Sequence, residues 1–330
     1  MYRRNQPIKY CFNIDNIFSI EFISNRDITF TPKIRNFLCS SCDGRFNIIK
    51  CQVFIEKEEN LDIKYKKIFN KYDIIKYRNE LSEFYSKGVS IIEEPNYNDL
   101  LPYTFYNFLF NNGLVDVLKG EFIFFHKSGI SVIFNIERRE AVVFSLSKKP
   151  EYFIIDDNIF FFILSIATIL NGGFILHSSF VILDNKGYIF CGNSGAGKST
   201  ITQLLDIENA FNDEAIIILN KNNRWEAVPT PFYQYRIVDN LSFFMSHKID
   251  SLFFLKQSPI CKLKSVEDID KIRGIEFILK NLIHFQVIFT PFIKKKLFNR
   301  VMDFSKDINF YDFYFNLNKE DILRSLGKID

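Results

Sequence analysis

A glycine-rich segment in the second half of the chain constrains the fold more than any other feature of the sequence. It spans Gly192–Thr200 and fits the pattern G-x-x-x-x-G-K-[ST], with a further glycine inside it. The apolar residues 188–191 before it predict a strand, and residues 198–205 after it predict a helix. Between a strand and a helix, such a loop turns successive backbone N–H groups inward toward phosphate oxygens. The segment therefore predicts a P-loop that binds a nucleoside triphosphate.

The residue types within this segment have separate roles in such a site. The predicted nucleotide-binding residues are Gly192, Asn193, Ser194, Gly195, Ala196, Gly197, Lys198, Ser199 and Thr200. We expect Lys198 to reach the β- and γ-phosphates as a point charge, and Ser199 to place its hydroxyl on Mg²⁺. The sequence therefore predicts ATP and Mg²⁺ as the cofactors, with GTP or pyrophosphate left open as the donor.

Three further residues flank the loop in the sequence. His177 lies in the apolar stretch 174–183, which predicts one strand beside the strand that enters the loop, and Asp213 with Glu214 precedes the apolar stretch 215–219. A carboxylate near a metal-bound γ-phosphate can accept the proton of an attacking hydroxyl. We therefore expect the pair Asp213–Glu214 to meet Mg²⁺ and a substrate hydroxyl beside Lys198 and Ser199, and we take His177 as a further candidate for the site. The alternatives are a buried imidazole hydrogen-bonded within a sheet and a solvated acidic turn.

The charge balance argues against several classes of partner. The chain has 42 Lys and Arg against 39 Asp and Glu, a net charge of +3, so long-range attraction to nucleic acid or anionic lipid is weak. Its longest nearly apolar run, residues 159–170, is shorter than the roughly 20 residues that cross a bilayer. The first residues do not read as a signal peptide. We expect a cytoplasmic protein that binds neither nucleic acid nor membrane.

The chain divides into two predicted domains. Residues 1–150 alternate short strands with turns and contain two helical patterns, at 73–87 and 100–111, which indicates a smaller α+β domain of unknown role. Residues 151–330 contain a buried helix over 157–170 and then alternating strands and helices around the glycine loop. Helical patterns at 266–285, interrupted at Gly274, and at 291–304 precede a strand at 310–317 and a helix at 319–326. This second half predicts an α/β domain.

Six cysteines occur, at positions 11, 39, 42, 51, 191 and 261. Without a secretory signal we expect free thiols, mostly buried in a strand-rich domain. Cys39 and Cys42 form a C-x-x-C motif, which could instead be half of a zinc site, with Cys51 as a third ligand, or a redox pair.

Several of these motifs together resemble a known family. The stretches Leu176–Ser179, Gly192–Ser199 and Asn212–Glu214 resemble the catalytic domain of HPr kinase/phosphorylase, and more closely the HPr-kinase-like serine kinases of ribosomal peptide maturation, including lasso-peptide kinases. Thr230-Pro231-Phe232 resembles a further loop of these relatives. The resemblance covers about residues 155–330. The run that follows the acidic pair in HPr kinases is not recognisable here, so HPr itself is a poor candidate substrate.

The resemblance implies a fold and a reaction. The fold would be that of phosphoenolpyruvate carboxykinase, in which the P-loop lies on a mixed sheet. The reaction would be phosphoryl transfer to a Ser or Thr hydroxyl of a peptide, protein or small molecule. The resemblance implies Asp213 as the base, His177 as the active-site histidine and Lys198 as the third catalytic residue, with Ser199 and Glu214 at the metal. A non-catalytic nucleotide-binding module that regulates or binds a partner is the alternative. A homo-oligomer also remains open.

Overall fold

In a computed structural model, the chain forms two compact units. The first comprises Met1–Ala167 and Gln286–Thr290, and the second comprises Thr168–Phe285 and Pro291–Asp330. The structure describes residues 7–15, 17–24, 27–42, 47–56, 122–127, 130–146, 154–205, 210–212, 214–232, 245–266, 268–282 and 291–327. The division falls inside helix α5 (Asp157–Leu170), whereas the sequence places a boundary before it, at 150/151. The helical patterns at 73–87 and 100–111 lie outside the described residues.

The first unit is built on a seven-stranded mixed sheet with the order β4-β1-β2-β5-β8-β7-β6. The strands of this sheet are β1 (Ile8–Ile14), β2 (Phe18–Ser24), β4 (Leu38–Cys39), β5 (Asn47–Glu56), β6 (Phe122–Lys127), β7 (Ile130–Asn135) and β8 (Glu140–Leu146). Strands β3 (Thr29–Phe30) and β9 (Ile154–Ile155) pair with each other in a separate two-stranded sheet. The central pairs β2/β5 and β5/β8 are parallel, and the outer pairs are antiparallel. A turn at 136–139 joins β7 to β8 in an antiparallel hairpin.

Aromatic rings fill the interior of this unit beside the short helix α1 (Pro32–Arg35). Phe12 lies within 4.7–5.7 Å, centroid to centroid, of Phe22, Phe30 and Phe160. Phe160 comes from α5, whose residues from 159 to 170 are all buried. Rings packed edge to face at these distances add attraction beyond the apolar area that they bury. Phenylalanine side chains thus form this part of the core.

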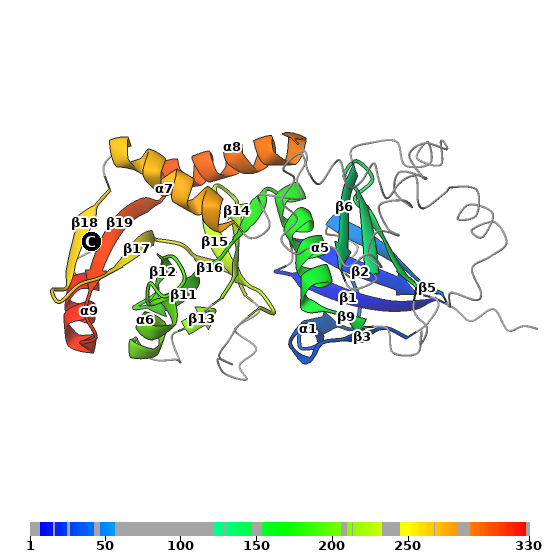
Figure 1. Cartoon of the computed structure of the whole chain (residues 1–330), viewed down its shortest axis with the longest axis horizontal. Helices are drawn as coiled ribbons and strands as arrows, with labels where there is room; N and C mark the ends of the chain where they lie inside the picture. Colours follow the sequence, from blue (N-terminus) through cyan, green and yellow to red (C-terminus); the bar gives the residue numbers. More distant parts are fainter. Residues whose placement is uncertain are drawn as a thin grey trace, which may run out of the picture. The chain divides into compact units, whose positions relative to one another are not determined.

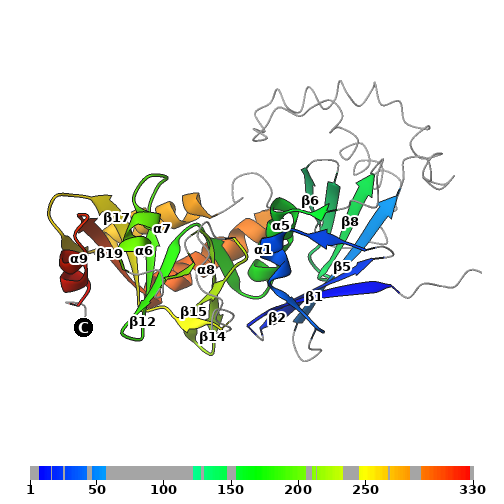
Figure 2. The ribbon, with the colours of Figure 1, turned by 90° about the horizontal axis from the view of Figure 1, so that it is seen from below.

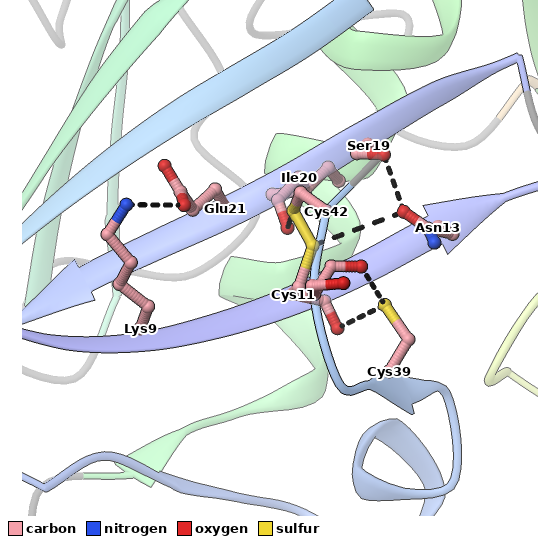
Figure 3. The surroundings of a disulfide bond; sticks show 9 residues. Lys9, Cys11, Asn13, Ser19, Ile20, Glu21, Cys39 and Cys42 are labelled. Atoms are coloured by element: carbon pink, nitrogen blue, oxygen red, sulfur yellow. Dashed lines mark hydrogen bonds and ion pairs between the residues drawn. A yellow bond between two sulfur atoms is a disulfide. The ribbon is translucent and has the colours of Figure 1, made fainter. Parts of the chain in front are cut away.

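The expectation of free thiols is wrong for two cysteines of this unit. Cys11 on β1 and Cys42 after β4 form a disulfide bond, whereas Cys39, Cys51, Cys191 and Cys261 are free (Figure 3). The pairing of β4 with β1 brings the segment that carries Cys42 next to β1, so the two residues meet although 31 positions separate them. Such a long-range contact follows from strand order, which the spacing of the cysteines does not reveal.

The second unit contains two sheets (Figure 1). A six-stranded mixed sheet has the order β13-β11-β12-β17-β19-β18, and a four-stranded antiparallel sheet has the order β10-β14-β15-β16. The strands are β10 (Gly173–Leu176), β11 (Ser179–Leu183), β12 (Lys186–Cys191), β13 (Ala210–Asn212), β14 (Ile216–Lys221), β15 (Arg224–Pro229), β16 (His247–Lys248), β17 (Ser251–Gln257), β18 (Lys262–Ser265) and β19 (Asn309–Phe315). Strands β12, β17 and β19 run parallel to one another. This unit is therefore α/β with a mixed sheet.

Helices cover both faces of the six-stranded sheet (Figures 1 and 2). On one face α6 (Lys198–Leu204) and α9 (Lys319–Leu326) pack on the rings of β12, β17 and β19, in a core that includes Ile201, Phe253 and Phe313. On the other face lie α7 (Asp268–Asn281) and α8 (Pro291–Asp307). Their contacts include Phe277 of α7 and Phe304 of α8, whose rings lie 5.3 Å from Phe254 and 6.0 Å from Phe310.

Helix α7 differs from its prediction, because it continues through Gly274. A Cβ at this position would lie 3.1 Å from ring atoms of both Phe254 and Phe310. The glycine therefore permits close helix-to-sheet contact and does not end the helix. Among the described residues, no helix is both long enough and apolar enough to span a bilayer.

Candidate functional site

The glycine loop has the predicted strand–loop–helix context. Strand β12 ends at Cys191, the loop follows, and α6 begins at Lys198. Within the loop the amide of Ala196 donates to the carbonyl of Asn193 at 3.0 Å, which closes a tight turn. Asn193, Ser194 and Gly195 are exposed at the tip of this turn. Because the loop follows one of three parallel strands, it lies at the carboxyl edge of the sheet, where ligands of α/β proteins commonly bind.

Contacts from the neighbouring parallel strands hold the loop in place. Gly197 has a φ of +103°, and a Cβ there would lie 2.5 Å from Cζ of Phe315 at the end of β19. The side-chain amide of Gln257, at the end of β17, donates to the carbonyl of Gly195 at 3.0 Å. A Cβ on Gly192 would lie 2.5 Å from Cβ of Ala196. The glycines therefore let the loop fold on itself and against β19.

Lys198 lies at the centre of this turn. Lys198 as a whole is 8% exposed. Its Nζ donates hydrogen bonds to the carbonyl of Gly192 at 2.8 Å and to the carbonyl of Asn193 at 3.4 Å. Burial lowers the pKa of the Lys198 amine, while the nearby Cys191 thiol and the Glu214 carboxylate act in the opposite direction. The amine is thus a buried cation held inside the loop by carbonyl groups of the loop itself.

His177 does not lie on the strand that the sequence predicts. The apolar stretch 174–183 is two strands, β10 and β11, which belong to different sheets, and His177 and Ser178 form the break between them. The chain leaves the ladder here because the Ser178 amide donates to the carbonyl of Glu214, at 3.2 Å, in the loop before β14. Periodicity alone does not indicate such a break, since apolar residues continue on both sides of it.

The break brings His177 next to Glu214. Nδ1 of the imidazole lies 3.4 Å from Oε1 of the carboxylate, and the two side chains are 29% and 33% exposed. Burial is the largest effect on the pKa of His177 and lowers it; the charge of Lys198 lowers it further, and Glu214 raises it. The charges of Lys198 and Glu214 thus act on the His177 pKa in opposite directions. The structure brings two of the predicted site residues, His177 and Glu214, into contact.

A buried asparagine braces the loop that carries Glu214. Oδ1 of Asn212 accepts hydrogen bonds from the amides of Glu214, at 3.0 Å, and Ala215, at 3.2 Å. Its Nδ2 donates to the carbonyl of Thr230 at 3.1 Å, and the Thr230 hydroxyl donates to the Ala215 carbonyl at 2.7 Å. The motif analysis did not assign a role to either residue. In the sequence, Asn212 stands before the apolar hairpin β14–β15 and Thr230 stands directly after it. These two short polar residues are the signal that could have identified both positions.

Three further predicted residues are Asp213, Ser199 and Thr200. Asp213 lies outside the described residues. Ser199 and Thr200 are in the first turn of α6 and are partly exposed. Within the described part of the chain, no group of three or more His, Cys, Asp and Glu side chains could hold a metal ion. Ser199 and Glu214 provide oxygen donors, which suit Mg²⁺, a cation that usually keeps several waters and uses only one or two carboxylates with the substrate phosphates.

No protein-family model matches this chain. No curated protein matches it either. Matches exist among solved structures, 53 chains in all. One is the structure of the Hpr(Ser) kinase/phosphatase from Coxiella burnetii, with a TM-score of 0.26 and 14% sequence identity, over 46% of this chain and 91% of that chain. The TM-score is low, so the description of the site rests on the geometry of this chain.

Proposed function

We propose that this chain is a P-loop phosphotransferase that uses ATP and Mg²⁺ to phosphorylate a Ser or Thr hydroxyl of a peptide, protein or small molecule. One observation carries the proposal: Nδ1 of His177 lies 3.4 Å from Oε1 of Glu214, and the charge of Lys198, inside the glycine loop, acts on the same imidazole. A phosphate-binding loop with a carboxylate and an imidazole beside it has the groups that phosphoryl transfer to a hydroxyl requires.

Each group has a proposed role. The loop backbone from Asn193 to Ser199 binds the phosphates, and Lys198 leaves its carbonyl partners to bind the β- and γ-phosphate oxygens. Ser199 and Glu214 hold the metal, which neutralises charge on the transferred group when it is bound. Asp213 is the proposed base that takes the proton of the acceptor hydroxyl.

His177 has a positioning role in this proposal. Its lowered pKa keeps the imidazole neutral near pH 7, so it orients the Glu214 carboxylate without cancelling its charge. The loop follows a strand of a mixed sheet, which agrees with a fold like that of phosphoenolpyruvate carboxykinase. We include this fold in the proposal, together with a role in peptide maturation. A homo-oligomer is compatible with it.

The test separates nucleotide binding from phosphoryl transfer. Binding is measured with a fluorescent ATP analogue, and transfer with γ-labelled ATP, Mg²⁺ and a panel of peptides, proteins and small alcohols. Lys198→Ala should lower the transfer rate by about 10²–10³-fold through loss of charge stabilisation. Lys280→Ala, which removes an exposed lysine of α7 in the same unit, is the matched control and should change neither readout. Transfer at the wild-type rate in Lys198→Ala would refute the mechanism.

A second candidate is a nucleotide-binding module without phosphoryl transfer. The hydrogen bonds from Lys198 to the loop carbonyls of Gly192 and Asn193 favour it, because such a loop binds phosphates whether or not a reaction follows. In that case the wild-type chain binds the nucleotide analogue and Lys198→Ala does not, while no acceptor of the panel becomes labelled. Asp213→Asn distinguishes the two functions further, since loss of a base lowers transfer by about 10²–10⁴-fold and leaves nucleotide affinity nearly unchanged.

A further inference from the structure

Three cysteines of the first unit meet at one edge of its sheet, far along the chain from the glycine loop. Strand β4, which has only two residues, pairs antiparallel with β1, and in this register Cys39 is the direct partner of Cys11. Cys42 follows on the bend after β4 and forms the disulfide bond with Cys11. Figure 3 draws the three side chains together beside β1 and β2. Cys11 is therefore next to two other cysteines, and it is bonded to one of them.

The second neighbour, Cys39, is within reach of Cys11. Directly opposed residues of an antiparallel pair carry their side chains on the same face, with Cβ atoms about 4.5–5.5 Å apart. A disulfide bond needs Cβ atoms about 3.5–4.5 Å apart. The edge strand β4 pairs with β1 through two residues only. A small shift of its backbone therefore brings the Cβ atoms of Cys39 and Cys11 to the distance that a disulfide bond needs.

The present contacts of Cys39 hold its thiol beside the disulfide-bonded residues. Its Sγ donates to the carbonyl of Cys11 at 3.1 Å and to the carbonyl of Ser41 at 3.5 Å, and the residue is partly exposed (Figure 3). Burial raises the pKa of the Cys39 thiol, so it is mainly protonated at neutral pH. Deprotonation removes the donor of both hydrogen bonds and leaves a thiolate beside Cys11.

We propose that Cys11, Cys39 and Cys42 form an internal thiol–disulfide exchange site, in which Cys11 is the shared member of two alternative disulfide bonds. In the exchange, the Cys39 thiolate attacks Sγ of Cys11, a Cys11–Cys39 bond forms and the Cys11–Cys42 bond breaks. Cys42 leaves as a thiolate and takes up the proton that Cys39 lost. One disulfide bond and one thiol are present before and after, so no oxidant or reductant is consumed.

The exchange changes which part of the chain is tied to β1. When Cys11 is bonded to Cys42, the segment after β4 is linked covalently to β1. When Cys11 is bonded to Cys39, β4 itself is linked to β1, and Cys42 is the reactive thiol. The thiolate of another molecule can therefore attack Cys42 in one state or Cys39 in the other, which forms a mixed disulfide with that cysteine and releases Cys11 as the thiolate. This inference is independent of the proposed phosphotransferase.

Pulsed alkylation of the native, oxidised full-length chain tests the proposal. The protein is incubated without reductant, and free thiols are labelled with N-ethylmaleimide after increasing times. The labelled sites and the linked peptides are then identified by mass spectrometry. We expect label on Cys39 in most molecules and on Cys42 in the remainder, with a Cys11–Cys39 peptide that appears together with the Cys42 label. In Cys39→Ser the Cys42 label should fall to background, whereas Cys261→Ser, which removes a partly exposed thiol of the other unit, should leave it unchanged.

A second variant tests the alternative bond directly. Cys42→Ser is equilibrated in a glutathione redox buffer, and we expect Cys11 and Cys39 to become linked to each other. The proposal is overturned if wild-type label stays confined to Cys39 among the three cysteines at all times, or if folded Cys42→Ser carries Cys11 and Cys39 only as free or separately glutathionylated thiols. The wild-type measurement decides the question on its own if Cys42→Ser does not fold.

Discussion

Replacing Gly197 by alanine should destabilise the second unit more than the same change at Gly195, although both glycines have positive φ. At Gly197 φ is +103°, and a non-glycine residue in such a region costs about 1–3 kcal/mol. The new Cβ would also lie 2.5 Å from Cζ of Phe315, which is buried in the core of α6 and α9. Forcing an extra carbon into a packed core adds about 1–3 kcal/mol. We expect a loss of about 2–6 kcal/mol in unfolding free energy.

Gly195 provides the matched control. Its φ is +78°, but a Cβ there meets no atom within 4 Å, so only the backbone cost of about 1–3 kcal/mol applies. Urea unfolding followed by tryptophan fluorescence measures both variants. Trp225, the single tryptophan of the chain, is buried in β15 and therefore reports on the second unit.

A double-mutant cycle isolates the contact with Phe315. In a Phe315→Leu background the ring is absent, so the cost of Gly197→Ala should fall by about 1–3 kcal/mol, toward the cost of Gly195→Ala. If Gly197→Ala costs the same in both backgrounds, the ring does not shape the loop and our reasoning is wrong. Nucleotide affinity, measured on the folded variants, should fall with Gly197→Ala because the loop must move away from the ring.

Three further predictions concern the imidazole, the disulfide bond and the buried asparagine. Glu214→Gln should lower the pKa of His177 further, because the carboxylate beside Nδ1 stabilises the imidazolium, as measured by NMR titration. Because the folded-state pKa of His177 already lies below 6.5, the unfolding free energy should fall as the pH drops through 6.5, and less so in His177→Gln. Cys11→Ser, which removes the shared cysteine and so both possible bonds, should destabilise the first unit by about 3–4 kcal/mol, since the bond closes a 31-residue separation, and leave the Trp225 transition in place. Asn212→Ala should cost about 1–3 kcal/mol in urea unfolding and slow phosphoryl transfer, because the amide that braces Glu214 is lost.

Each of these has a result that contradicts it. A pKa of His177 that rises in Glu214→Gln would mean that the carboxylate does not stabilise the imidazolium. Equal stability of Cys11→Ser and the wild-type chain would mean that the bond does not constrain the unfolded state. Wild-type transfer in a folded Asn212→Ala would show that Glu214 is positioned without the asparagine.

The sequence allowed prediction of those parts of the fold that depend on local pattern. The strand before Gly192, the helix from Lys198 and the buried helix over 157–170 follow from apolar periodicity and from a loop whose residue types permit one geometry. The break at His177 does not follow, because a contact with the Glu214 loop, distant in sequence, ends β10 there. The Cys11–Cys42 bond was missed for the same reason: it depends on which strands become neighbours.

The distinction between a kinase and a binding module depends on Glu214 more than on the glycine loop. The loop and Lys198 support each other through the carbonyl groups of Gly192 and Asn193, and such a cradle holds phosphates whether or not a reaction follows. Transfer also needs a carboxylate that stays ionised beside a buried cation and an imidazole. Asn212 fixes the backbone of that carboxylate through two amide hydrogen bonds, and the lowered pKa of His177 favours an uncharged imidazole beside it. A loop that only bound nucleotide would need neither arrangement, so Glu214→Gln, which keeps the shape and removes the charge, should separate the two functions by lowering transfer and not binding of the nucleotide analogue.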